Sequence, residues 1–298
     1  MPYIADFLTP EDLQRISNLQ VVARTVVEGF VTGMHKSPHK GFSIEFAQHR
    51  PYVQGDEIRR LDWKVYGKTD RYYVREYEEE TNLRATILLD LSGSMAYGSA
   101  NVSKAEYAVR LSAALAYLMM RQADSVGLAT FDAKIRRYIP PRSSVSHLKV
   151  LLGELSKSRT GEETQLGEVF RKLVPRMHRR GLLIILSDCF DDIKSLNSAL
   201  TQFRAAHHEV LIFQIVDRDE LDFPFKEWTH FECLEKEGYT QTVEPAAFRS
   251  AYMKKLKEFQ KELTDNCHRN RIELCQIVTD EPYAEALAKF LTKRLSMA

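Results

Sequence analysis

Three near-continuous apolar runs constrain the fold of this chain more than any other feature of its sequence. They read ATILLDL at residues 85–91, GLLIILSD at 181–188 and EVLIFQIVD at 209–217. A strand with one face in water alternates apolar and polar residues, whereas unbroken runs are typical of strands buried on both faces. Apolar residues at helical spacing separate the runs, for example at 103–122 and 194–206. This alternation predicts an α/β fold with a doubly wound, mostly parallel sheet.

A change of composition predicts where the chain divides. Residues 1–33 carry apolar residues at helical spacing, whereas residues 32–81 are rich in Gly, Pro, Arg and Tyr and contain short alternating segments. We therefore expect residues 1–80 to form an N-terminal helix followed by a small β-rich extension. Residues 81–298 are expected to form the α/β domain.

Charge, hydropathy and cysteine usage exclude some classes of function. The formal net charge of +1 gives no overall attraction to nucleic acid or to anionic lipid. No stretch approaches the roughly 18 apolar residues of a membrane span, and no basic start precedes an apolar stretch at the N-terminus. The four cysteines form no Cys-x-x-Cys pair, which favours reduced thiols. The sequence thus predicts a cytoplasmic protein with no membrane span and no nucleic acid partner.

Oxygen-bearing side chains follow the first apolar run at alternate positions, as Asp90, Ser92 and Ser94. Ligand sites in such sheets lie at the carboxyl ends of the strands, and Mg²⁺ prefers oxygen ligands. Asp188 ends the second run in the same geometric position, and Thr164 precedes a predicted helix. Each residue also has an ordinary structural interpretation, because serine and threonine cap helices and aspartate starts turns.

The pattern Asp-x-Ser-x-Ser, then Thr, then Asp resembles the metal-ion-dependent adhesion site of von Willebrand factor A-like domains. Residue by residue, it falls on Asp90, Ser92, Ser94, Thr164 and Asp188. The resemblance implies a Mg²⁺ site, with Mn²⁺ or Ca²⁺ as alternatives, whose coordination is completed by an acidic side chain of a partner protein. Two positions depart from the family: Glu163 stands where a Gly is common, and Cys189 follows Asp188 where a Gly is common. Asp191 or Asp192 therefore remains an alternative for the last acidic ligand.

The segment before this domain indicates a more specific family within the von Willebrand factor A-like proteins. It contains Arg50-x-Tyr52, Gly55-Asp56-x-x-Arg59 and Asp62-Trp63. This block resembles a prokaryotic family of von Willebrand factor A-like proteins, commonly encoded beside MoxR-type AAA+ ATPases. The resemblance implies a non-enzymatic adaptor whose partner is such an ATPase or its client. Candidate partner-binding residues are Arg59, Trp63 and Asp191.

The charged block at residues 50–80 has two interpretations. Its arginines and carboxylates could form ion pairs that fix a small unit to the main domain, since Arg suits bidentate pairing. Alternatively, the block could be a docking surface for a partner. The aromatic residues of the block also suggest stacking on nucleic acid, but the neighbouring acids would oppose a phosphate backbone.

Two further hypotheses concern Asp90. In a metal-dependent phosphotransferase or hydrolase, Asp90 would be the nucleophile, but haloacid-dehalogenase-type chemistry needs an acid two residues later, where Ser92 stands. In a scaffold, the metal site would be vestigial. The sequence favours the metal-dependent binding module, which is not an enzyme.

Overall fold

The computed structural model describes residues 46–52, 63–77, 83–99, 102–161, 166–177, 179–235 and 238–295. The chain divides into two compact units, a small one within Met34–Asn82 and a larger one that contains the residues from Leu83 onward. The predicted domain limits, 1–80 and 81–298, stay a prediction, because most of residues 1–80 lie outside the described part.

The larger unit is built on a six-stranded sheet. Its strands are β3 (Arg84–Asp90), β4 (Ser125–Phe131), β5 (Ile135–Arg142), β6 (Leu182–Ser187), β7 (Glu209–Val216) and β10 (Glu273–Val278), in the order β10-β7-β6-β3-β4-β5. Every neighbouring pair is parallel except β4 and β5. Counted in chain order the strands run 3-2-1-4-5-6, the Rossmann-type order, and this confirms the predicted fold class. The order reverses between β3 and β6, so their carboxyl ends border the crevice where such sheets bind ligands.

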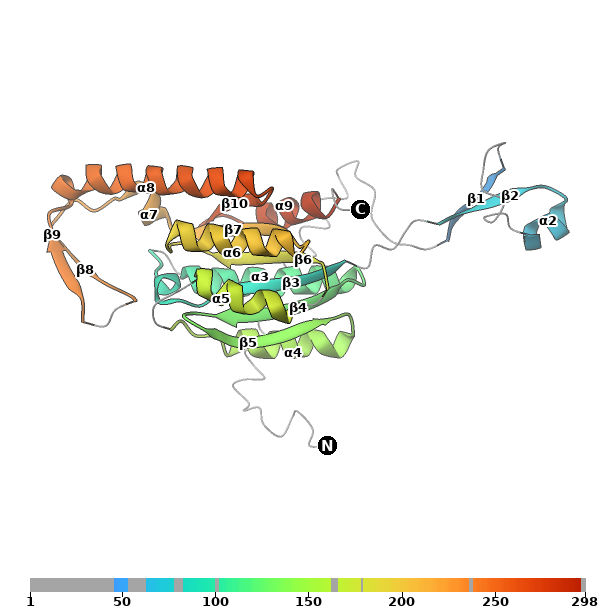
Figure 1. Cartoon of the computed structure of the whole chain (residues 1–298), viewed down its shortest axis with the longest axis horizontal. Coiled ribbons are helices and arrows are strands. Elements are labelled where there is room, and N and C mark those ends of the chain that lie inside the picture. Colours follow the sequence, from blue (N-terminus) through green and yellow to red (C-terminus); the bar gives the residue numbers. More distant parts are fainter. Residues whose placement is uncertain are drawn as a thin grey trace, which may run out of the picture. The chain divides into compact units, whose positions relative to one another are not determined.

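Helices cover both faces of the sheet (Figure 1). One core contains side chains of α3 (Lys104–Arg121), α4 (Val145–Ser156) and α9 (Tyr283–Leu295), and the other contains those of α5 (Leu166–Leu173), α6 (Ile193–Ala205) and α8 (Pro245–Arg269). In β3, Ile87 and Leu89 enter the first core while Leu88 enters the second. The unbroken apolar runs are thus required because successive side chains fill opposite cores.

Between β7 and α8 the chain leaves the sheet. It forms the short helix α7 (Arg218–Asp222) and an antiparallel hairpin of β8 (Thr229–Glu232) and β9 (Thr240–Val243). The described part of the larger unit also contains two 3-10 turns, η3 (Gly93–Ala96) and η4 (Val174–Arg176). None of the helices that the structure describes is both long and apolar enough to cross a membrane.

The described part of the small unit is a hairpin and one helix. β1 (Phe46–Pro51) pairs antiparallel with β2 (Tyr73–Tyr77), and α2 (Trp63–Thr69) lies between them in the chain. Tyr66 stacks on Tyr72 with ring centroids 4.6 Å apart. Trp63 meets Tyr66 edge-on and is 59% exposed, so its ring is not part of a buried core.

Candidate metal centre

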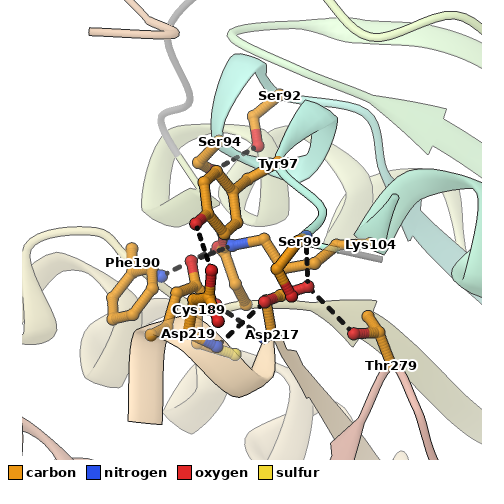
Figure 2. Close-up of polar contacts among 12 residues, drawn as sticks. Ser92, Ser94, Tyr97, Ser99, Lys104, Cys189, Phe190, Asp217, Asp219 and Thr279 are labelled. Carbon is orange, nitrogen blue, oxygen red and sulfur yellow. Dashed lines mark hydrogen bonds and ion pairs between the residues drawn. The ribbon is translucent and has the colours of Figure 1, made fainter. Parts of the chain in front are cut away.

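The loop that follows β3 gathers the three predicted oxygen ligands. Asp90 is fully buried, and its two carboxylate oxygens accept hydrogen bonds from the Ser92 amide at 2.9 Å and the Ser187 hydroxyl at 2.6 Å. The Ser92 backbone is extended, and the 3-10 turn η3 follows it. This conformation brings the Ser92 and Ser94 hydroxyl oxygens within 3.2 Å of each other (Figure 2).

Asp188 lies at the end of β6, the strand that neighbours β3. Its carboxylate is fully buried, and Oδ1 accepts a hydrogen bond from the Phe190 amide at 3.1 Å. Burial raises the pKa of Asp90 to about 7, and the nearby charge of Asp188 adds to the increase. The sheet therefore places two buried carboxylates side by side, as the sequence predicted from the two strand ends.

Cys189, directly after Asp188, has a φ of 62°. This left-handed conformation is one that glycine adopts without a steric penalty, whereas other residues rarely adopt it. The resemblance led to the expectation of a Gly at this position, and the backbone geometry supplies the physical reason. The Ser187 hydroxyl accepts the Cys189 amide at 2.9 Å and so helps to hold the turn.

A buried lysine, which the sequence analysis did not single out as part of the site, balances the carboxylates. Lys104 is the first residue of α3, and its Nζ lies 2.8 Å from Asp188 Oδ2 and 2.6 Å from Glu220 Oε1. Burial lowers the pKa of Lys104, but the adjacent Asp188 and Glu220 carboxylates outweigh it and raise the pKa above its usual value. The ammonium group is thus charged at neutral pH.

Two capping patterns in the sequence could have located Lys104 and Glu220. Ser103 caps α3 by accepting the Glu106 amide, so Lys104 stands at the first helical position. Asp217 and Glu220 form a reciprocal capping box at α7. Each pattern predicts a helix start, but neither predicts that the two starts meet.

The segment of residues 91–99 contains Ser92 and Ser94, and we call it the serine loop. Asp217 fixes its position relative to the sheet. Its Oδ2 accepts hydrogen bonds from the Ser99 amide at 3.0 Å and from the Thr279 hydroxyl at 3.1 Å, and the Tyr97 hydroxyl donates to Asp219 Oδ2 at 3.3 Å (Figure 2). The segment after η3 is therefore bonded to the residues that follow β7 and β10.

The remaining predicted site residues are less closely tied to this centre. Asp191 accepts the Gly167 amide of α5 at 3.3 Å, and Asp192 caps α6 by accepting the Ser195 amide at 2.9 Å. Thr164 and Arg59 lie outside the described residues, so their predicted roles stay predictions. Trp63 is exposed among the described residues of the small unit, and its predicted partner-binding role stays a prediction.

The donor set fits a hard divalent cation. The Lys104 ammonium contacts Asp188 and Glu220, while Asp90 lies near enough to Asp188 for their charges to interact, so a divalent cation would offset the excess of negative charge. Two ligands at right angles on Mg²⁺ are separated by about 3.0 Å, which is close to the observed separation of the serine hydroxyls. Among the described residues no three His, Cys, Asp or Glu side chains group as a metal site, so a metal here needs the serine oxygens.

The segment between β7 and α8, which contains β8 and β9, approaches the serine loop at Gly93 and is called the covering segment. A Cβ added to Gly93 would collide with the backbone carbonyl of Leu234, just beyond β8. Leu234 is 44% exposed, and Trp228 and Tyr239 in the same segment are 71% and 63% exposed. The covering segment therefore reaches the edge of the candidate metal centre and carries exposed apolar side chains.

Comparisons with known proteins identify a family and several distant relatives. The model of the family described as "Protein of unknown function DUF58" matches residues 48–262. The uncharacterized protein Rv1480 of Mycobacterium tuberculosis is 25% identical over 222 residues, which cover 74% of this chain and 69% of the relative. A solved structure of an aerotolerance-related membrane protein from Bacteroides fragilis is 17% identical, with 72% of this chain and 100% of that chain covered and a TM-score of 0.49. The structure of the SpRpn10 VWA domain is 13% identical, with 70% of this chain and 95% of that chain covered and a TM-score of 0.42. The fold assignment rests on the strand order, and these distant likenesses add nothing to it.

One of these findings contradicts the predicted localisation. The sequence analysis predicted a cytoplasmic protein because no apolar stretch could span a membrane, yet the matched Bacteroides fragilis chain is described as a membrane protein. The absence of a span therefore does not assign a compartment, and the cytoplasmic prediction is withdrawn.

Replacing the buried ammonium tests the charge balance of the centre. We expect Lys104→Met to lower the free energy of unfolding by about 3–5 kcal/mol, because Asp188 and Glu220 would lose their countercharge. Urea denaturation at pH 7, followed by circular dichroism, measures the change. The control is Lys172→Met, whose exposed pair with Glu168 contributes about 1 kcal/mol or less. Equal losses in the two variants would contradict the assigned role of Lys104.

Filling the space at Gly93 tests the covering segment. We expect Gly93→Ala to displace residues 229–243 and to cost about 1–3 kcal/mol, since the new methyl group collides with a backbone carbonyl. Hydrogen exchange should become faster in β8 and β9 while β3 and β6 stay protected. Gly67→Ala is the control, because nothing lies within 4 Å of that position. Unchanged exchange in β8 and β9 would show that the segment does not depend on Gly93.

Proposed function

Because this chain belongs to the family described as "Protein of unknown function DUF58", whose name assigns no activity, we propose a function from the geometry of its candidate metal centre. The chain is a non-enzymatic protein-binding module. Asp90, Ser92 and Ser94 hold a divalent cation, Mg²⁺ in the first place, and an acidic side chain of a partner protein completes the coordination.

One observation carries this proposal: a carboxylate and two hydroxyls converge at the switch point of the sheet. Asp90 and Ser92 are fully buried while Ser94 is partly exposed, so the group of oxygens reaches from the interior to the surface. A site that only stabilised the fold would not need to open to solvent. An exposed side is what a ligand from another molecule requires.

Each residue at this centre would have a different role in holding the metal. When bound, Mg²⁺ would supply positive charge and a coordination position that a partner carboxylate can take from water. Asp90 would provide the anionic ligand, held in orientation by the Ser92 amide and the Ser187 hydroxyl. Asp188 would add negative charge beside the centre, while Lys104 limits that charge and keeps Asp188 in place. Thr164 is proposed as a further hydroxyl ligand from the resemblance alone.

Selectivity for a partner would come from the surface around the centre. The exposed side chains of Trp228, Leu234 and Tyr239 lie on the covering segment, which approaches Gly93. Aromatic residues are enriched in protein interfaces, because they bury a large apolar area at a low cost in conformational entropy. A partner that offers an acidic residue flanked by apolar side chains would match this arrangement.

The proposed partner is a MoxR-type AAA+ ATPase or a client protein that this ATPase remodels. The support is the upstream block, with Arg50-x-Tyr52 and Asp62-Trp63, which resembles proteins commonly encoded beside such ATPases. The family match begins at residue 48, so it includes this block together with the metal centre. Trp63, Asp191 and, by resemblance, Arg59 are the proposed additional contacts.

The geometry argues against the enzymatic alternative. A nucleophilic carboxylate must reach its substrate, but Asp90 is fully buried and both of its oxygens accept hydrogen bonds from the chain. Direct measurement of metal binding distinguishes the binding module from a scaffold with a vestigial metal site.

Metal binding is tested with Mn²⁺ as the probe. We expect the protein to bind Mn²⁺ in calorimetric titration, and Ser94→Ala to weaken the affinity at least about tenfold, because one oxygen ligand is removed. Ser146→Ala, at an exposed position in α4, is the control and should bind as the wild type does. A wild-type protein that binds no Mn²⁺, or a Ser94→Ala variant with unchanged affinity, would favour the vestigial scaffold.

Partner capture is tested with immobilised protein in the presence of Mg²⁺ or EDTA. We expect a MoxR-type ATPase or its client to be retained by the wild type with Mg²⁺, and to be lost both in EDTA and with Asp90→Ala. Mass spectrometry identifies the captured proteins, and Ser146→Ala serves as the matched control. Retention of the same partner in EDTA would separate the interaction from the metal.

A further inference from the structure

A second concave site lies at the end of the sheet opposite the metal centre. It is formed at the amino ends of β3, β6 and β7, and its volume is about 360 Å³. Arg84, the first residue of β3, is roughly 20 Å from Asp90 along the strand at about 3.3 Å per residue. The two sites therefore do not share residues. We call this second site the arginine pocket, and its polar lining consists of Arg84, Thr86, Tyr138, Arg176, Arg179 and His208.

No carboxylate of the described residues balances the positive charge of the arginine pocket. Arg84, Arg176 and Arg179 form no ion pair with any carboxylate of the described residues, and no Asp or Glu lines the pocket. Other arginines of the larger unit do form ion pairs, as Arg204 does with Glu209 and Arg218 with Asp280. Three unpaired guanidinium groups around one concavity repel each other, so an anion would relieve that repulsion.

Two polar side chains add hydrogen-bonding capacity to this positive charge. Tyr138 lines the pocket together with Arg84 and Arg176. Burial raises the pKa of Tyr138, while the charges of these two arginines oppose that increase. His208 is buried and also lines the pocket, and burial lowers its pKa. The pocket thus combines fixed positive charge with a hydroxyl and an imidazole ring.

The rest of the lining is apolar. Met177, Leu182, Leu183, Pro140 and Pro141 complete the wall. Small-molecule sites commonly have volumes of about 300–1,000 Å³ and combine an apolar wall with a few polar groups. The arginine pocket meets this description, and it is larger than an inorganic anion needs.

We propose that the arginine pocket binds a small phosphorylated molecule, with the phosphate on the three arginines and the organic part against the apolar wall. A phosphate group carries up to two negative charges and accepts bidentate hydrogen bonds from guanidinium groups. A single carboxylate would leave more of the positive charge uncompensated. A nucleic acid backbone is a poorer match, because it requires an extended basic surface rather than a single concavity.

The test uses adenosine 5′-monophosphate as the probe in calorimetric titration of the whole chain. We expect binding with a Kd of about 1 mM or tighter, and about a tenfold or greater loss of affinity in the Arg176→Gln, Arg179→Gln double variant, because two charge-assisted contacts to the phosphate are removed. Both arginines are exposed, so their replacement should leave the thermal unfolding midpoint unchanged. Arg137→Gln, an exposed arginine outside the pocket, is the control and should bind as the wild type does.

Three further titrations identify what the pocket recognises. Inorganic phosphate should bind more weakly than the nucleotide and should compete with it, whereas adenosine without phosphate should not bind measurably. Citrate at equal ionic strength should compete poorly. Binding of adenosine as tight as that of the nucleotide, equal competition by citrate, or no loss of affinity in the double variant would each overturn the proposal. These experiments contain no divalent cation, so their outcome is independent of the metal centre.

Discussion

Charge balance among carboxylates buried at the switch point is the constraint on which the rest of this structure depends. The parallel pairing of β3 with β6 brings two strand ends together, and each end carries a fully buried aspartate, Asp90 or Asp188. Burying charge without compensation costs several kcal/mol per ion. Lys104, at the start of α3, compensates Asp188, and hydrogen bonds from Ser92 and Ser187 stabilise Asp90. The described residues at this place nevertheless carry fewer positive charges than negative ones. A cation from solution is the physical complement of that arrangement.

The surrounding elements hold the loop of oxygens in place and leave one side open. Asp217 bonds the segment after η3 to the strand ends, and the capping box at α7 fixes Glu220 against Lys104. The covering segment crosses Gly93, where only a residue without a side chain allows so close an approach. Rigid support from the sheet and an exposed rim are together what a binding site for another protein requires.

The sequence predicted those parts that depend on local pattern. The apolar runs located the central strands to within one residue, and the strand ends located Asp90 and Asp188, because burial on both faces of a sheet leaves a clear pattern in the chain. The contacts of Lys104 could not be predicted in this way, because its partners are 84 and 116 residues distant and only the fold brings them together. The hairpin of β8 and β9 was not predicted either, because its strands are short, largely exposed and not distinctly apolar. The arginine pocket has a similar origin, since Arg84, Tyr138 and Arg176 come from separate elements.

Anomalous diffraction from a crystal grown with Mn²⁺ tests the central claim most directly. The account predicts one anomalous peak at the carboxyl end of β3, within about 2.0–2.2 Å of the Ser92 and Ser94 hydroxyl oxygens and adjacent to Asp90. It also predicts that Lys104 keeps its contact with Asp188 while the metal is bound. A peak at another place, or none at a Mn²⁺ concentration in the millimolar range, would contradict the account. The oxygens at the end of β3 would then be part of the architecture alone.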